Sequence, residues 1–340
     1  MIGGLLPSPP PPSVASEDFF GVSGVLSDEA DFELMEDSRV GVYRVLFHFR
    51  AAKRQREGFY DWRRLDRLVT STATREIELL PLLYGTPDWI STDESIPPIY
   101  NEEASKQWQR LLEELVSRYG PNGLFWRLNP LLEPRPIRTW QIWNEPNDPA
   151  FWGPRPDAAA YAHLIDISAR AIRSIDPEAR LIGAGITANP GASSGVAGDA
   201  YLRDLLSHSE AVAQLNAIGF HPYARSMRGV RAALRSARGE LVRAGLPLKP
   251  IWVTEVGWGS GGGRRGGDLV KNDPGQARAL KLTLRMISRR RLSLGVQRAL
   301  WYYWRDQPDP RCRWCRTAGL IDSDRRPKAS YDAFVDLARP

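Results

Sequence analysis

The chain has 340 residues, of which 42% are hydrophobic and 25% are charged, and its formal net charge is +6. These proportions are ordinary for a globular protein, so they exclude the disordered and fibrous classes. The length suits a β/α barrel, which takes about 250 residues and tolerates insertions. The sequence contains no run of about 18 apolar residues, so we expect no membrane span.

The positive charge comes from arginines scattered along the chain and does not indicate nucleic-acid binding. Its densest clusters are Arg289 to Arg291, near the end of a predicted helix, and Arg264 with Arg265, in a glycine-rich loop. Neither cluster is interleaved with aromatic residues, and cations are favourable at a helix carboxyl end in any case. We therefore expect no nucleic-acid partner.

The beginning of the chain predicts a flexible leader. Five of the six residues from Pro7 to Pro12 are proline, which favours an extended conformation. Residues 1–6 lack the basic region and the full apolar core of an export signal. The predicted division is a leader at 1–17 and a single folded domain at 18–340.

From residue 18 onward, short apolar segments alternate with amphipathic ones. The apolar runs predict strands at 19–22, 40–49, 79–84, 139–143, 180–184, 217–220, 251–256 and 297–304. The helical periodicity predicts helices at 28–37, 61–74, 101–119, 157–175, 200–207, 230–244, 274–290 and 328–338. Eight strand-helix pairs without a break in composition predict the α/β class and a closed (β/α)8 TIM barrel. The alternative is an open, doubly wound sheet, which more often has fewer repeats.

Gly257 to Gly262 spells a dinucleotide-binding fingerprint after a predicted strand. The residues that follow predict a loop, so no helix amino terminus would face a pyrophosphate. We interpret residues 259–267 as a mobile loop over the barrel mouth and expect no organic cofactor.

The two cysteines, Cys312 and Cys315, lie in an irregular segment. A structural zinc site needs four ligands, and no second Cys or His pair accompanies them. A redox pair would be expected to follow a strand and open a helix. We expect a disulfide, which favours an extracellular or cell-surface protein; a cytoplasmic location is the alternative.

Two predicted strands end in a glutamate with aromatic neighbours: Glu145, followed by Pro146, and Glu255, followed two residues later by Gly257. In a β/α barrel the carboxyl ends of the strands surround the active site. Paired carboxylates at that position are the equipment of a retaining glycosidase. Each glutamate alone could be a solvated charge, but polar and aromatic residues at six predicted strand ends favour a shared site.

The sequence resembles a known group of enzymes at these two glutamates. Trp-Asn-Glu-Pro-Asn at 143–147 and Thr-Glu-Val-Gly-Trp at 254–258 resemble the signatures of glycoside hydrolase clan A, a barrel superfamily with catalytic glutamates on strands four and seven. The stretches 83–89 and 118–123 look most like glycoside hydrolase family 39 and related bacterial glycosidases. The similarity extends from about residue 18 to the end of the chain.

The resemblance implies that Glu145 is the general acid/base and Glu255 the nucleophile. Asn144 would bind the 2-hydroxyl of the sugar, and Arg44 and Tyr223 would keep Glu255 ionised and oriented. The negative charge of Glu255 would raise the pKa of Glu145 and keep it protonated.

The same resemblance implies further substrate-binding residues. His221 would line the subsite of the cleaved sugar, Trp304 would form the platform beneath it, and Trp89 is a weaker candidate for that platform. Neither a metal nor a cofactor is required. The expected partner is a carbohydrate substrate, and we expect a monomer.

The sequence also departs from family 39, whose β-xylosidase and α-iduronidase members usually carry a β-sandwich after the barrel. Two other functions remain as alternatives: a non-catalytic carbohydrate-binding barrel, and a barrel enzyme such as an aldolase or metal hydrolase. The second lacks a lysine at any predicted strand end.

Overall fold

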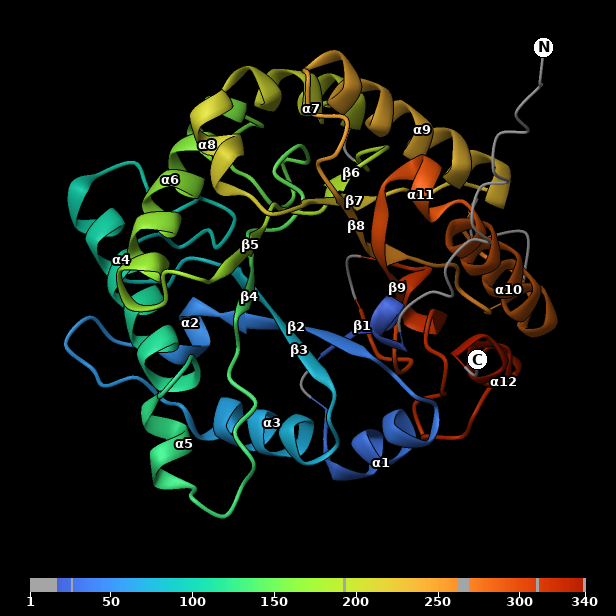
Figure 1. The fold of residues 1–340 in the computed structure, drawn as a ribbon, viewed down its shortest axis with the longest axis horizontal. Helices are drawn as coiled ribbons and strands as arrows, with labels where there is room; N and C mark the ends of the chain where they lie inside the picture. The colour runs from blue at the N-terminus through green and yellow to red at the C-terminus, as the bar shows by residue number, and fades with distance from the viewer. Residues whose placement is uncertain (1–16, 26, 192–193, 262–268, 310–311, 339–340) are drawn as a thin grey trace, which may run out of the picture.

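We describe the protein from a computed structural model, for residues 17–25, 27–191, 194–261, 269–309 and 312–338. Except for Glu17, the predicted leader lies outside these residues, as does most of the predicted glycine-rich loop. Within them, the strands are all parallel and form one curled sheet surrounded by helices (Figure 1). The strands are β1 (Phe20–Gly24), β2 (Val42–His48), β3 (Glu78–Tyr84), β4 (Thr139–Ile142), β5 (Arg180–Ile182), β6 (Ile186–Thr187), β7 (Ile218–His221), β8 (Ile251–Val256) and β9 (Val296–Tyr302).

The sheet closes on itself because β5 and β6 are two halves of one interrupted strand. The strand order is β5-β4-β3-β2-β1-β9-β8-β7-β6. β5 pairs with β4, β6 pairs with β7, and an isolated bridge joins Ile182 to Ala217 just before β7. Eight strand positions therefore surround one axis, which confirms the predicted (β/α)8 barrel.

Each of the eight predicted helices has a counterpart, with ends within three residues of the prediction. The long helices are α1 (Glu29–Asp37), α3 (Arg63–Thr74), α4 (Glu102–Tyr119), α6 (Ala158–Ile175), α7 (Gly198–Ser207), α9 (Met227–Arg243), α10 (Asp273–Arg289) and α12 (Ala329–Ala338). Four short α-helices and two 3-10 turns were not predicted: α2 (Phe49–Ala52), α5 (Leu124–Leu128), α8 (Ser209–Gln214), α11 (Arg291–Leu294), η1 (Glu17–Phe19) and η2 (Cys315–Thr317). Segments of three to six residues are too short to show a helical period in the sequence.

The inside of the barrel has an apolar floor below a polar layer. The floor is a separate cluster of buried side chains contributed by several strands: Val42, Leu80, Ile182, Ala217, Trp252 and Leu300. Side chains two residues apart on a strand point to the same face. Arg44, Thr254 and Tyr302 therefore follow Val42, Trp252 and Leu300 toward the carboxyl ends of their strands. This order places polar groups at the mouth and apolar groups beneath them.

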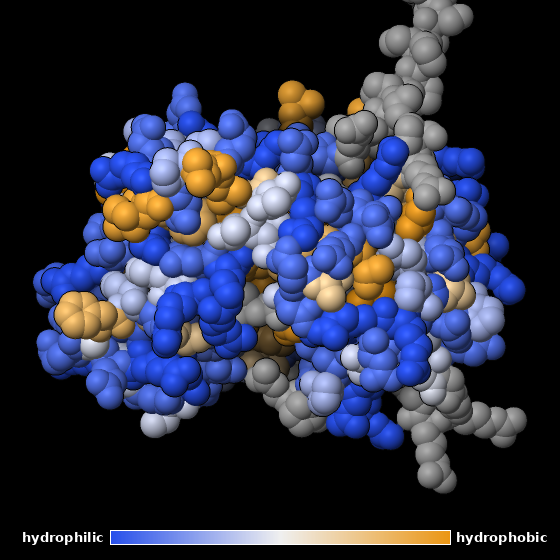
Figure 2. All heavy atoms as spheres, turned by 90° about the horizontal axis from the view of Figure 1, so that it is seen from below, coloured by the Kyte–Doolittle hydropathy of each residue, from blue (hydrophilic) through white to orange (hydrophobic). Residues whose placement is uncertain are grey.

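The outer surface carries small, separate apolar areas. The face in Figure 2 is mostly hydrophilic, and its hydrophobic residues lie in scattered patches. Among the described helices, none is both long and apolar enough to cross a bilayer. Scattered patches of this kind are normal for a folded domain and do not mark a docking surface by themselves.

The contact between α4 and α6 includes a buried hydrogen bond that can be tested. Trp108 Nε1 donates to Ser168 Oγ over 2.9 Å, and both side chains are fully buried. We expect Ser168→Ala to lower the free energy of unfolding by about 1–3 kcal/mol, because the indole N–H then has no partner. Urea denaturation measures the change, with Ser174→Ala, at an exposed position of the same helix, as the control. Equal effects of the two substitutions would contradict this account.

Candidate active site

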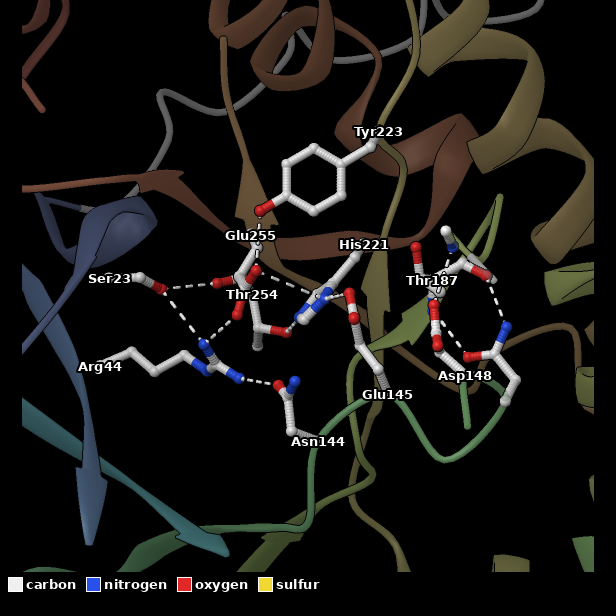
Figure 3. A network of polar contacts seen from close by, with 12 residues as sticks. Ser23, Arg44, Asn144, Glu145, Asp148, Thr187, His221, Tyr223, Thr254 and Glu255 are labelled. Atoms are coloured by element: carbon white, nitrogen blue, oxygen red, sulfur yellow. Dashed lines mark hydrogen bonds and ion pairs between the residues drawn. The ribbon is translucent and has the colours of Figure 1, made fainter. Parts of the chain in front are cut away.

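Six of the predicted site residues meet at the carboxyl ends of the strands. They are Arg44, Asn144, Glu145, His221, Tyr223 and Glu255, contributed by β2, β7 and β8 and by the turns after β4 and β7 (Figure 3). All but Tyr223 are less than 10% exposed. The barrel thus brings two carboxylates into a confined, largely dehydrated space.

Glu255 is held as a carboxylate by three neighbours. Arg44 Nη1 donates to Glu255 Oε1 over 2.5 Å, and the Tyr223 hydroxyl donates to Glu255 Oε2 over 2.7 Å. Burial by itself raises the pKa of Glu255, but the charges of His221 and Arg44 and the Tyr223 hydrogen bond together lower it below its usual value. Glu255 is therefore ionised at neutral pH.

The surroundings of Glu145 shift its pKa in the opposite direction, upward. Its Oε1 lies 2.7 Å from His221 Nδ1, and the other ring nitrogen of His221 lies 3.0 Å from Thr254 Oγ1. Burial raises the pKa of Glu145 and the charge of Glu255 adds to this, which outweighs the lowering effect of His221. The barrel therefore shifts the pKa values of the two carboxyl groups in opposite directions, upward for Glu145 and downward for Glu255.

The two carboxyl groups are close neighbours. One oxygen of Glu145, one oxygen of Glu255 and a ring nitrogen of His221 lie within 4.8 Å of one another. Such a trio could in principle hold a metal ion. The Arg44 guanidinium, however, already supplies the cation that Glu255 binds, so the donor set fits an ion pair better than a metal.

Local backbone geometry turns both glutamates toward the barrel axis. Trp143 and Glu145 have positive φ angles of 68° and 38°, a conformation that costs a residue other than glycine about 1–3 kcal/mol. Asn147 compensates by hydrogen bonding through its side chain to the backbone of Thr187 and Val196. On β8, the pairing with β9 changes register between Val253 and Val256. Glu255 lies within this irregular stretch.

A cavity of about 360 Å³ opens onto the two carboxylates. Its lining includes Arg44, Asn144, Glu145, Glu255, Tyr302 and Tyr303, together with His48, Tyr84 and Glu94 on the side of β2 and β3. His221 is fully buried behind the glutamates, and so it supports them rather than lining the cavity as we predicted.

The two predicted platform residues lie outside the cavity lining. Trp304 is 1% exposed, does not line the cavity, and packs against Tyr331 of α12. Trp89 also lies outside the cavity lining, where it packs edge-on against Phe49 and donates to the Lys53 carbonyl. Neither placement matches a platform beneath a sugar, because neither ring lines the cavity.

Sequence reasoning missed two residues that connect the polar layer. Gln141 accepts from Arg44 Nε over 2.5 Å and donates to Thr254 Oγ1 over 3.3 Å. Thr254 in turn contacts His221. Their signal was present in the sequence, since each is a polar residue inside a predominantly apolar strand.

The segment after β9 lies beside this site. Cys312 and Cys315 are joined in a disulfide. Between them, Trp314 packs edge-on against the Tyr223 ring, with ring centroids 5.1 Å apart, and contacts the Tyr302 ring at a tilt, with centroids 5.6 Å apart. The disulfide-bonded turn therefore contributes to the aromatic wall around Glu255.

A parallel barrel with a close pair of carboxyl groups at its strand ends, whose pKa values are shifted in opposite directions, has the architecture of the barrel glycosidases. Residues 49–328 match the family described as the glycosyl hydrolase catalytic core, and the chain belongs to this family. This membership agrees with the resemblance to glycoside hydrolases found in the sequence. A search of curated protein sequences gave no match.

Solved structures with a similar fold include three glycosidases. A family 39 glycoside hydrolase from the gut symbiont Bacteroides cellulosilyticus WH2 is 20% identical, with 96% of this chain and 65% of that chain covered and a TM-score of 0.66. A monomeric β-xylosidase from Caulobacter crescentus CB15 is 20% identical over 96% and 69%, with a TM-score of 0.70. A family 10 endoxylanase from a sugarcane soil metagenome is 14% identical over 96% and 98%, with a TM-score of 0.65. At these identities the likeness concerns the fold alone.

The Arg44–Glu255 pair gives a prediction about stability that does not depend on turnover. Removing one partner of a buried ion pair leaves the other charge uncompensated, so we expect Arg44→Met to lower the free energy of unfolding by about 3–5 kcal/mol. The double variant Arg44→Met/Glu255→Gln is expected to recover much of this loss. Chemical denaturation measures both.

The control for this experiment is Lys106→Met, which removes an exposed pair with Glu102 and is expected to cost about 1 kcal/mol or less. If Arg44→Met lowered the free energy of unfolding no more than the control does, the buried pair would contribute no more to stability than an exposed pair.

Proposed function

We propose that this glycoside hydrolase cleaves O-glycosidic bonds of oligo- or polysaccharides with retention of configuration, by double displacement. One observation carries the proposal: the two buried carboxyl groups have oxygens within 4.8 Å of each other and opposite pKa shifts. Retaining enzymes separate their carboxyl groups by about 5–5.5 Å, whereas inverting enzymes need about 6.5–9.5 Å to admit a water.

In the first step, an oxygen of Glu255 bonds to the anomeric carbon as the bond from that carbon to the leaving oxygen breaks. Glu145 gives its proton to the leaving oxygen. The product is a glycosyl ester on Glu255, which has lost its negative charge. The pKa of Glu145 then falls, since the carboxylate that helped to raise it is gone.

In the second step, Glu145 acts as the base. It takes a proton from a water molecule, whose oxygen bonds to the anomeric carbon as the ester bond to Glu255 breaks. Both carboxyl groups return to their starting states. Two displacements at one carbon retain its configuration.

Two neighbouring groups have supporting roles in this proposal. Asn144 Oδ1 accepts from Arg44 over 2.8 Å, so its amide N–H groups are the ones available to the 2-hydroxyl of the sugar. Tyr302 takes the platform role that we first predicted for Trp304, because it lines the cavity and packs against the ring of Tyr223.

The roles of the two glutamates can be separated by substitution. We expect Glu255→Gln to lower kcat by roughly 10³-fold or more, because no nucleophile remains. Glu145→Ala is expected to retain activity only toward aryl glycosides with good leaving groups and to be rescued by azide, which attacks the glycosyl ester without a base. Glu178→Ala, an exposed glutamate, is the control. Unchanged turnover in either active-site variant would contradict the proposal and favour a carbohydrate-binding barrel.

The pH dependence of kcat/KM follows from the two pKa shifts. Activity requires an ionised Glu255, whose pKa lies below the usual 4.5, and a protonated Glu145, whose pKa lies above it. We therefore expect a bell-shaped profile with an acidic limb below pH 4.5 and an alkaline limb above it. Tyr223→Phe removes a hydrogen bond to the Glu255 carboxylate, so its acidic limb is expected to move to higher pH.

The matched control is Tyr60→Phe. In the described part of the chain the Tyr60 hydroxyl makes no hydrogen bond, so its removal is expected to leave both limbs in place. An acidic limb that does not move in Tyr223→Phe would show that this hydrogen bond does not stabilise the ionised Glu255.

A further inference from the structure

A second hollow adjoins the catalytic cavity at the end of β2. Its volume is about 280 Å³, against about 360 Å³ for the cavity that contains the two carboxyl groups. Leu46 and His48 line both of them. These two side chains follow Arg44 on β2 at intervals of two residues, so all three point to the same face of the strand. The second hollow therefore lies beside the catalytic cavity, and it has no role in the two displacement steps.

Much of the lining of the second hollow is apolar. This part comes from the segment after β1, from β2, from α2 and from α3: Val25, Leu46, Ala51, Ala52 and Leu65. Because alanine has the smallest side chain after glycine, α2 leaves the space beside it unfilled. Binding sites for small molecules combine apolar walls of this kind with a few polar groups that fix orientation. The C–H groups on the face of a sugar ring suit such a wall.

Charged side chains supply the polar part of the lining: Arg54, Asp61 and Arg64. Asp61 is already paired with Arg63, whose Nη2 lies 2.6 Å from Asp61 Oδ2. In the described part of the chain, the guanidinium groups of Arg54 and Arg64 form neither an ion pair nor a hydrogen bond. A guanidinium has N–H donors and no acceptor, so these two groups are available to the hydroxyl oxygens of a sugar.

The position of Glu145 indicates which part of a substrate the second hollow holds. In the proposed reaction Glu145, in the turn after β4, gives its proton to the leaving oxygen. The described residues that line the second hollow belong to β2, α2 and α3 and to the segments after β1 and α2, and none of them belongs to β4 or the turn after it. A sugar unit in the second hollow is therefore joined to the cleaved sugar on the side away from the leaving group.

We propose that the second hollow is a binding subsite for one further sugar unit on the non-leaving side of the cleaved sugar, so that the preferred substrates present at least two linked sugars there. Its volume is about four-fifths of that of the catalytic cavity, which suits one unit and not two. This inference rests on the proposed function, since it concerns the substrate of the same site.

The test compares aryl glycosides of one, two and three β-1,4-linked xylose units, and the corresponding series of glucose units. The aryl leaving group is the same throughout, so a difference in kcat/KM reports on the added sugars. We expect a gain of at least about tenfold from one unit to two, because binding energy from a remote unit can lower the barrier to cleavage, and less than about threefold from two units to three. A gain of less than about threefold at the second unit in both series would overturn the inference, and so would an equal gain at the third unit.

The variant Ala51→Leu narrows the second hollow. Ala51 is exposed, so a larger side chain at this position is compatible with folding. We expect the gain at the second unit to fall to about threefold or less, because the added atoms occupy the space of the sugar. Ala159→Leu is the matched control, since Ala159 is also exposed on a helix but lines neither cavity, and it is expected to keep the full gain. A full gain in Ala51→Leu would overturn the inference.

The variant Arg64→Met removes one of the two available guanidinium groups. We expect the gain at the second unit to fall by about threefold or more, through loss of a hydrogen bond from a charged donor. Arg67→Met is the matched control, because Arg67 is exposed on the same helix and lines neither cavity. An equal gain in the two variants would overturn the assignment of Arg64 to the subsite.

Binding separates this inference from the proposed function. Calorimetry with Glu255→Gln measures the affinity for the same glycosides without turnover. If the wild-type protein cleaves none of them, the proposed hydrolysis fails, and tighter binding of two units than of one, lost in Ala51→Leu/Glu255→Gln, would still support the subsite. Cleavage with equal kcat/KM for one and two units would leave the proposed function standing and overturn the inference. Binding of none of the glycosides, without cleavage, would overturn both.

Discussion

The buried ion pair between Arg44 and Glu255 is the interaction on which the site depends. Two charges inside a barrel are stable only if each finds hydrogen-bond partners that replace water. Arg44 meets this condition by donating to Glu255, Asn144 and Gln141, which belong to β8 and to β4 or the turn after it. The requirement to satisfy one guanidinium therefore fixes the relative positions of the strands that carry the two glutamates.

The surroundings of the two glutamates also explain why their pKa values shift in opposite directions. Glu255 has Arg44 and the Tyr223 hydroxyl on its two oxygens, whereas the charged groups that act on the pKa of Glu145 are His221, Glu255 and Asp148. His221 contacts Glu145 closely but does not offset its burial. The asymmetry is a property of the surroundings and not of the residues, which are the same amino acid.

The barrel and the meeting of the two glutamates could be predicted from the sequence, because they follow from repeating patterns and from where strands end. The eight alternations gave the barrel, and the parallel strands brought Glu145 and Glu255 to the same end of it. Trp304 was misplaced because β9 ends at Tyr302, two residues earlier than its apolar run predicts. Glu94 was missed because it lies between elements, where no period of 2 or 3.6 residues indicates which way a side chain points.

Chemistry and selectivity are therefore built from different parts of the chain. Arg44, Thr254 and the glutamates sit on or directly after strands, whose register every neighbour constrains. Trp314 lies in a connecting segment, where a disulfide-bonded turn holds it beside the rings of Tyr223 and Tyr302. Because the strands fix the charge of the reacting carboxylates, the connecting segments can change the charge and shape of the cavity without disturbing that chemistry. The same barrel can in this way accept different sugars with one mechanism.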